Sequence, residues 1–113
     1  MKTTDLIPIG QLASRTGVSV SAIRFYEDKG LIRAMRNAGG QRRFLRSDVR
    51  RLSFVMIAQQ LGFSITEIGD LLSGLPQERT PTKADWTKIS AQFRERLDAQ
   101  IETLELMRDR LDV

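Results

Sequence analysis

Apolar residues recur every three or four positions along most of this chain, and that period predicts helices. Four stretches of this kind precede position 76, and one much longer stretch follows position 81. Between the second and third stretches the pattern alternates between apolar and polar residues, which is typical of short strands. The pattern therefore predicts a mainly α protein with one small β-hairpin.

Two short helices are predicted near the N-terminus, after residues 1–7, which we expect to fray. The first covers residues 9–15. The second covers residues 19–29, because Ser19 is a good N-cap and Gly30 can end a helix in the left-handed conformation. A three-residue turn that contains Gly17 joins them, which is the spacing of a helix-turn-helix, although many helical hairpins share it.

The second of these helices has two different faces. One carries Val20, Ile23, Tyr26 and Glu27, and the other carries Ser21, Arg24, Phe25 and Asp28. The second face suits the major groove of DNA, where an arginine can bind a guanine edge with two hydrogen bonds. A solvated helix face would explain the same residues about as well.

An arginine-rich hairpin is predicted next. Residues 32–36 and 41–45 can pair as strands around a loop at 37–40, whose two glycines permit positive φ. The arginines of this region, Arg36, Arg42, Arg43 and Arg46, would then lie beside the second helix, like a wing along the phosphate backbone. A surface hairpin with solvated arginines is the alternative.

Two further helices complete the predicted head of the molecule. Ser47 is expected to cap a helix that ends before Gly62, with Asp48 near its positive end and an inward stripe of Val49, Leu52, Met56 and Gln59. Ser64 and Glu67 form a capping box for the next helix, whose inward residues are Ile65, Ile68, Leu71, Leu72 and Leu75. The free amides at this box could hold a DNA phosphate.

The last predicted helix is too long for so small a protein to cover. Thr82 caps it, and its apolar stripe consists of Trp86, Ile89, Phe93, Leu97, Ile101, Leu104, Met107 and Leu111. Its roughly thirty residues reach about 45 Å, so the far end needs another apolar surface. Because the spacing is not a strict heptad, we expect an antiparallel pair of these helices in a homodimer. The predicted organisation is thus a head at residues 1–76, a linker at 77–81 and a dimerisation helix at 82–113.

Composition narrows the possible functions. The chain has no Cys and no His, so it lacks the usual general base and the thiolate and imidazole metal ligands, and an enzyme is not expected. It also lacks an apolar run long enough to span a membrane, which favours a cytoplasmic location.

The charge is unevenly distributed. The net charge is +4, but residues 1–60 carry +7 and residues 61–113 carry −3. Seven of the eleven cations in the first part fall within residues 33–51, and all seven are arginines: Arg33, Arg36, Arg42, Arg43, Arg46, Arg50 and Arg51. This half of the chain is the candidate surface for a polyanion.

Three motifs resemble one known family. The runs IGQLASRTGVSVSAIRFYEDKGLI, RNAGGQRRF and LGFSITEIGDLL are similar to the N-terminal half of MerR-family transcription regulators. The resemblance implies a homodimer that binds a palindromic promoter with an overlong spacer and distorts it so that RNA polymerase can engage both promoter elements. It also implies DNA contacts from Ser21, Arg24 and Tyr26 in the helix and from Arg36, Gln41, Arg42 and Arg43 in the wing, with Arg50 a weaker candidate.

The linker and long helix, LPQERTP and WTKISAQFRERLDAQIETLELMRDRLD, resemble the redox-sensing branch of that family. Members of this branch hold a two-iron two-sulfur cluster through four cysteines in a loop after the long helix. This chain stops at Val113, near the start of such a loop, and residues 1–113 have no ligand for a cluster. We expect redox sensing only in a version that continues through those cysteines. A relative that senses something else, or nothing, is the alternative.

The complete set of predicted DNA contacts is Ser19, Ser21, Arg24, Phe25, Tyr26, Arg36, Asn37, Gln41, Arg42, Arg43, Arg46, Arg50 and Ser64. The predicted partners are duplex promoter DNA, RNA polymerase and a second copy of the chain, with no membrane. Two alternatives remain open at this stage: a MerR-like regulator that answers a different ligand, and a dimeric helical adaptor whose basic face meets another protein.

Overall fold

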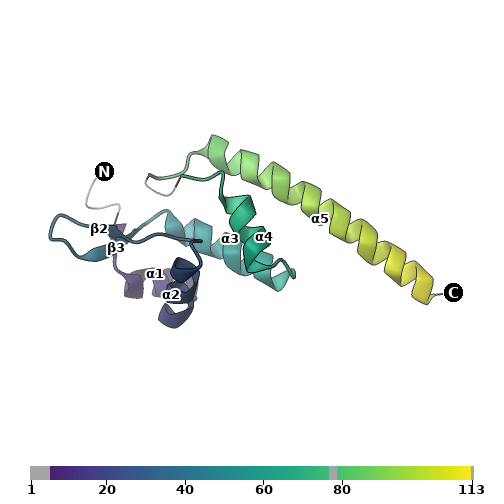
Figure 1. Cartoon of the computed structure of the whole chain (residues 1–113), viewed down its shortest axis with the longest axis horizontal. Coiled ribbons are helices and arrows are strands. Elements are labelled where there is room, and N and C mark those ends of the chain that lie inside the picture. The colour runs from purple at the N-terminus through teal and green to yellow at the C-terminus, as the bar shows by residue number, and fades with distance from the viewer. Residues whose placement is uncertain (1–5, 77–78, 113) are drawn as a thin grey trace. The chain divides into compact units, whose positions relative to one another are not determined.

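A computed structural model describes residues 6–76 and 79–112 of the chain, and it is mainly helical, as predicted (Figure 1). The elements in order are β1 (Leu6–Ile7), α1 (Ile9–Thr16), α2 (Val20–Asp28), β2 (Met35–Arg36), β3 (Arg42–Leu45), α3 (Asp48–Gln60), α4 (Ile65–Leu72) and α5 (Lys83–Leu111). They form two compact units, of which the first covers residues 1–81 and the second covers residues 82–113. The first unit is called the head below.

The head contains a small antiparallel sheet in the order β1-β3-β2. Leu6 pairs with Leu45 and Ile7 with Phe44, so the expectation that residues 1–7 fray is wrong for these two. A strand of two residues is too short to show a period, and its partner lies far along the chain. The hairpin itself is confirmed with narrower bounds, since residues 32–34 are not part of β2.

The predicted helix-turn-helix is present, and local hydrogen bonds hold its turn. Gly17 has a φ of 75°, which favours glycine, and its amide donates to the carbonyl of Ala13. Thr16 Oγ1 donates to the Leu12 carbonyl at 2.8 Å and accepts from the amide of Val18 at 3.1 Å. These hydrogen bonds join residues that lie at most four positions apart, so the turn between α1 and α2 is stabilised by local interactions.

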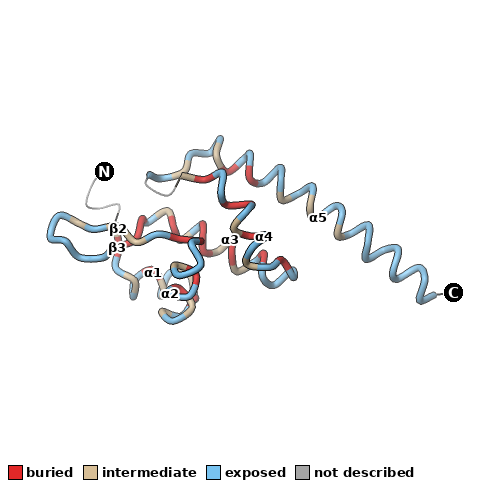
Figure 2. Tube along the Cα trace, viewed as in Figure 1, coloured by how far each residue is buried: buried red, intermediate tan, exposed pale blue. Residues whose placement is uncertain are grey.

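The start of α3 differs from the prediction. Ser47 precedes the helix, but its backbone is already helical and its side chain makes no capping hydrogen bond. The inward stripe is also different, because Val55 and Ala58 are fully buried, Val49 and Met56 are only half-buried, and Gln59 is exposed. Helix α3 contacts both α1 and α4, so its buried residues are decided by two neighbouring helices, and Figure 2 shows buried and exposed residues interspersed along it.

The predicted caps of α4 and α5 are both confirmed. Ser64 Oγ accepts from the amide of Glu67 while Glu67 accepts from the amide of Ser64, and Thr82 with Asp85 forms the same reciprocal pair. The inward residues Ile68, Leu71 and Leu72 are buried as expected. Leu75 is buried too, although α4 ends at Leu72.

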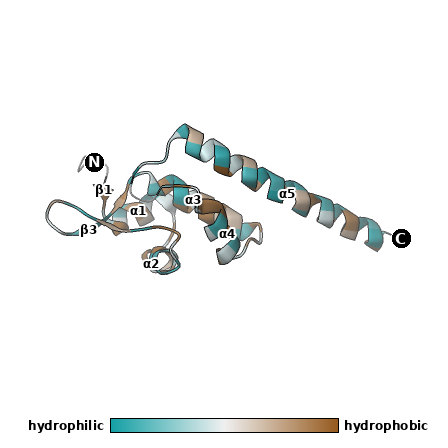
Figure 3. Ribbon diagram, turned by 45° about the horizontal axis from the view of Figure 1, so that its top comes forward, coloured by the Kyte–Doolittle hydropathy of each residue, from teal (hydrophilic) through white to brown (hydrophobic). Residues whose placement is uncertain are grey.

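Helix α5 is one continuous helix of 29 residues, as predicted. Figure 3 shows hydrophobic bands recurring along its otherwise hydrophilic surface. The stripe changes in character along the helix: Trp86 and Ile89 are buried, Phe93 and Leu97 are half-buried, and Ile101, Leu104, Met107 and Leu111 are exposed. Within the described ranges, no helix is long and apolar enough to cross a membrane.

Candidate nucleic-acid interface

The polar face of α2 lies on the surface of the head. Ser21, Arg24, Phe25 and Asp28 are all exposed, while Ile23 and Tyr26 on the opposite face are buried. The two faces are therefore divided as the sequence predicted. A surface helix that presents a hydroxyl, a guanidinium and an aromatic ring offers the groups that read base edges in the major groove.

The two serines at the start of α2 form a small cluster. Ser19 Oγ accepts from the amide of Ala22 at 3.1 Å, and it lies 3.2 Å from Ser21 Oγ. Ser19 is thus confirmed as the N-cap. Its predicted contact with DNA would have to be made by an oxygen that already serves the helix.

Tyr26 is placed differently from the other predicted contacts in α2. Only 8% of the residue's surface is exposed, and its hydroxyl donates to Oε1 of Gln59 in α3. The residue therefore holds α2 against α3. Its predicted direct contact with DNA stays a prediction, and the buried ring leaves little of the side chain to make one.

Asn37 organises the tip of the hairpin. Its Oδ1 accepts from the amides of Gly39 and Gln41, at 3.0 and 2.9 Å, and its Nδ2 donates to Oε1 of Gln41. Gly40 completes the turn with a φ of 78°. Two of the predicted wing contacts, Asn37 and Gln41, therefore also fold the loop that carries them.

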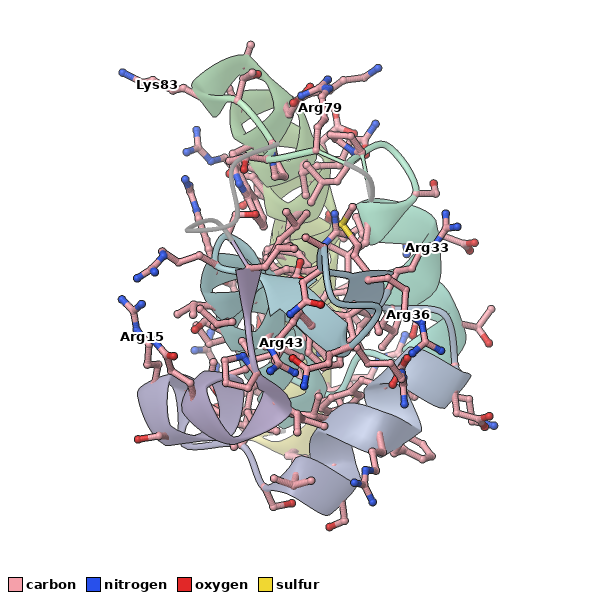
Figure 4. All side chains as sticks on the ribbon, turned by 90° about the vertical axis from the view of Figure 1, so that its left-hand side faces the viewer. Arg15, Arg33, Arg36, Arg43, Arg79 and Lys83 are labelled. Carbon is pink, nitrogen blue, oxygen red and sulfur yellow. The ribbon has the colours of Figure 1, made fainter. Side chains whose placement is uncertain are left out.

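The hairpin arginines are held by the hairpin itself. Arg36 Nη1 donates to the Gly40 carbonyl at 2.9 Å, and Arg43 Nη2 donates to Oε1 of Gln41 at 2.9 Å. Figure 4 looks onto this end of the head and shows Arg36 and Arg43 on the hairpin, with Arg15 and Arg33 to either side. Guanidinium groups that are already positioned lose less side-chain freedom when they bind a phosphate.

One ion pair joins the wing to α2. Arg42 of β3 donates to Oε2 of Glu27, fifteen residues earlier in the chain. The sequence placed Glu27 on the inner face of α2 and gave it no role. The structure thus brings together the two elements that were predicted to contact DNA, through a residue that sequence reasoning did not single out.

Adjacent arginines at the start of α3 have different environments. Arg46 and Arg50 are exposed, as a phosphate contact requires, but Arg51 is only 2% exposed. Counting Arg51 with the surface cations was wrong. Its Nε lies 3.5 Å from Oδ1 of Asp48, and its Nη2 donates to the carbonyl of Pro76 at 2.7 Å, which ties α3 to the chain beyond α4.

Burial also changes the acid–base properties of this pair. Loss of hydration raises the pKa of Asp48 to about 6, even though Arg51 and a backbone hydrogen bond with Leu45 both favour the carboxylate. Loss of hydration likewise lowers the pKa of Arg51, against the attraction of Asp48. For both groups the cost of burial exceeds the gain from pairing, so this is a structural pair and not part of the basic surface.

Other residues near the site were not predicted. Lys29, whose ammonium lies 5.6 Å from the ring centroid of Phe25, adds charge beside the exposed face of α2, and Arg15 is an exposed cation in the last turn of α1. The i,i+4 spacing of Phe25 and Lys29 could have revealed the first of these. Ser64, the remaining predicted contact, is exposed and is engaged in its capping box.

A helix-turn-helix with an exposed polar second helix, flanked by an arginine-bearing hairpin, defines the class of winged helix-turn-helix DNA-binding proteins. Two family models match this chain. The model described as MerR HTH family regulatory protein matches residues 7–75, and the model described as MerR, DNA binding matches residues 49–113. The chain belongs to the MerR family and is a transcription regulator.

Individual relatives agree with this assignment. The chain is 48% identical over 106 residues to the HTH-type transcriptional activator SoxR homolog of Chromobacterium violaceum, covering 94% of this chain and 72% of the relative. A MerR family transcriptional regulator from Listeria monocytogenes has a similar structure, with a TM-score of 0.62 and 30% identity over 94% of this chain and 80% of that one.

A third comparison concerns a complex with DNA. HiNmlR, described as a MerR family regulator lacking the sensor domain and bound to promoter DNA, gives a TM-score of 0.59 over 95% of this chain and 85% of that chain. At 23% identity this likeness shows a shared fold.

Proposed function

We propose that the chain is a SoxR-type regulator that binds a palindromic promoter as a homodimer and activates transcription. The observation that carries the proposal is the 48% identity to a SoxR homolog across nearly the whole chain. The exposed face of α2 and the preorganised hairpin arginines support it, because they supply base-reading and phosphate-binding groups on one head.

The homodimer is proposed from α5. Four of its apolar residues, Ile101, Leu104, Met107 and Leu111, are at least half exposed, and they continue the stripe that begins at Trp86. An apolar row of this length in water is stabilised by pairing with a second copy. Two joined heads would then read two half-sites, which matches a palindromic operator.

Activation is proposed to act through the shape of the DNA. A dimer that grips two half-sites with rigid heads can bend and untwist the spacer between them, so that RNA polymerase engages both promoter elements. Two parts of the head are held by local hydrogen bonds and supply this rigidity. They are the hairpin, whose loop amides donate to Asn37, and the helix-turn-helix, where Thr16 donates to Leu12.

The proposal assigns no redox chemistry to residues 1–113. An iron-sulfur cluster needs thiolate or imidazole ligands, and the sequence contains no Cys and no His, so these residues do not fit such a group. We expect a colourless protein whose affinity for its operator is the same under oxidant and reductant. An oxidant-dependent affinity in the purified 113-residue chain would contradict this part of the proposal.

The central experiment selects duplexes from a random pool with the purified chain and measures binding by fluorescence anisotropy. We expect a two-fold symmetric consensus, and an affinity that falls by orders of magnitude between roughly 50 and 200 mM salt. Arg24→Ala should reduce the binding free energy by about 1–3 kcal/mol, and the base preference at one position of the consensus should be lost. A chain that selects no consensus would contradict the proposed function.

A further inference from the structure

We propose that Phe25 reads a thymine methyl group in the operator, an inference that rests on the proposed function and names one element of its specificity. The DNA-binding class alone does not require this contact. Phe25 is an exposed aromatic ring whose position in the free protein is already defined.

Phe25 is 45% exposed and is the one large apolar side chain exposed on α1 or α2, both of which lie wholly within the described residues. It shares the outer face of α2 with Ser21, Arg24 and Asp28. An apolar ring of this size facing water forfeits burial energy, which is recovered when a partner covers it. Here the partner that covers the face is proposed to be the major groove.

The ring of Phe25 is supported by two neighbouring side chains. It packs edge-on against Tyr26, with the ring centroids 5.7 Å apart and the planes at 67°, and the Tyr26 hydroxyl is anchored to Gln59 of α3. The Lys29 ammonium also lies over the ring, 5.6 Å from its centroid. These contacts hold the ring toward the outside of α2 without covering it.

The chemistry of the major groove then selects the base. Among the base-edge groups of the major groove, the C5 methyl of thymine is the one methyl group, and the polar groups are hydrogen-bond donors or acceptors. A phenyl ring makes no conventional hydrogen bond, so placing it against a polar edge would leave that edge unsatisfied. The thymine methyl is therefore the base-edge partner that Phe25 can cover with a gain, while the adjacent Arg24 remains able to bind a guanine.

The test replaces thymine with uracil, which removes only the C5 methyl. Each thymine in the selected duplex is substituted in turn, and the affinity of the wild-type chain is measured by anisotropy. We expect at least one position at which the loss of the methyl weakens binding about fourfold, the equivalent of one buried methyl group. Equal affinity at every position would overturn the inference.

Variants identify the side chain responsible. In Phe25→Ala and Phe25→Gln, the affinity for the thymine duplex divided by that for the uracil duplex should be close to one at that position. Arg24→Ala should lower both affinities and leave this ratio unchanged. A ratio that persists in both Phe25 variants would assign the effect to DNA flexibility and would also overturn the inference. Failure of the wild-type chain to select any duplex would instead contradict the proposed function.

Discussion

At the scale of single residues, Arg50 and Arg51 show how little a residue type says about its role. Both fall in the same arginine cluster of the sequence, and they are neighbours on α3. A helix turns by about 100° per residue, so consecutive side chains point in different directions. Arg50 is exposed, and Arg51 faces the interior beside Asp48.

The two arginines should respond differently to substitution. Arg51→Met leaves Asp48 buried without its cation, so we expect the free energy of unfolding to fall by about 3 kcal/mol or more. Arg50→Ala should change stability by less than about 1 kcal/mol and should reduce the salt slope of DNA binding by about one. Urea denaturation and salt titrations measure both effects. A stable Arg51→Met variant with a reduced salt slope would contradict this assignment.

Asp48 gives the head a specific pH dependence. Its pKa rises from 3.8 to about 6 on folding, so the folded state binds the proton more tightly than the unfolded state. The stability contributed by this group is complete below pH 4 and is lost as the pH rises through 6. The stability lost in this way is about 3 kcal/mol at most, because a shift of one pKa unit equals 1.36 kcal/mol.

The comparison with Asp48→Asn isolates this effect, since asparagine does not titrate. We expect wild type to lose stability relative to Asp48→Asn between about pH 4 and pH 6.5, as measured by urea denaturation at each pH. If the stability of wild type relative to Asp48→Asn stayed constant or increased with pH, Asp48 would not be the desolvated carboxyl group described above.

At the scale of elements, the ion pair between Glu27 and Arg42 couples α2 to the wing. The pair is partly exposed, with 52% of the Arg42 side chain and 22% of the Glu27 side chain accessible, so its contribution to stability is small. Its larger effect is on geometry, because it determines where β3 lies relative to α2. In the proposed function both elements contact the same stretch of DNA, so their relative position affects specific binding.

Glu27→Gln should therefore lower the ratio of specific to non-specific affinity. We expect a decrease of up to about fivefold, since exposed ion pairs contribute up to about 1 kcal/mol. Asp28→Asn is the matched control, because Asp28 is exposed at the same end of α2 and, within the described part of the chain, forms no ion pair with the wing. Removing its charge should raise both affinities together. Equal ratios in the two variants would argue against a coupling role for Glu27.

At the scale of the whole molecule, the distribution of apolar surface along α5 favours a homodimer. The stripe is buried at Trp86 and Ile89 and becomes exposed from Ile101 onward. Among the described residues, this second half of the stripe is exposed, and two copies in the proposed antiparallel arrangement would cover each other's exposed halves.

Charges placed in this stripe should separate the copies. Ile101→Lys combined with Leu104→Lys should give monomers in sedimentation and should abolish binding to the two-half-site operator, because each buried lysine would be desolvated without a partner. Glu102→Ala combined with Glu105→Ala changes the same turns of the helix outside the stripe and should leave the dimer intact. A lysine variant that still sediments as a dimer would place the interface elsewhere.

The local structure of this protein could be predicted from its sequence. The helix caps at Ser19, Ser64 and Thr82, the turn that contains Gly17, the two faces of α2 and the single long helix α5 depend on residue types and spacing within a few positions, and all are present in the structure. The family resemblance was also readable, because it rests on contiguous motifs. Local interactions of this kind leave a signal in spacing and residue type.

Which of the predicted contact residues are exposed depends on tertiary packing and could not be predicted from the sequence. Four features depend on residues at least fifteen positions apart in the sequence. They are the pairing of β1 with β3, the hydrogen bond from Arg51 to Pro76, the hydrogen bond from Tyr26 to Gln59 and the ion pair between Arg42 and Glu27. No period or cap encodes such contacts. They arise because packing the helices fixes the rotation of each one about its axis, and that rotation determines whether a given arginine faces the core or the solvent.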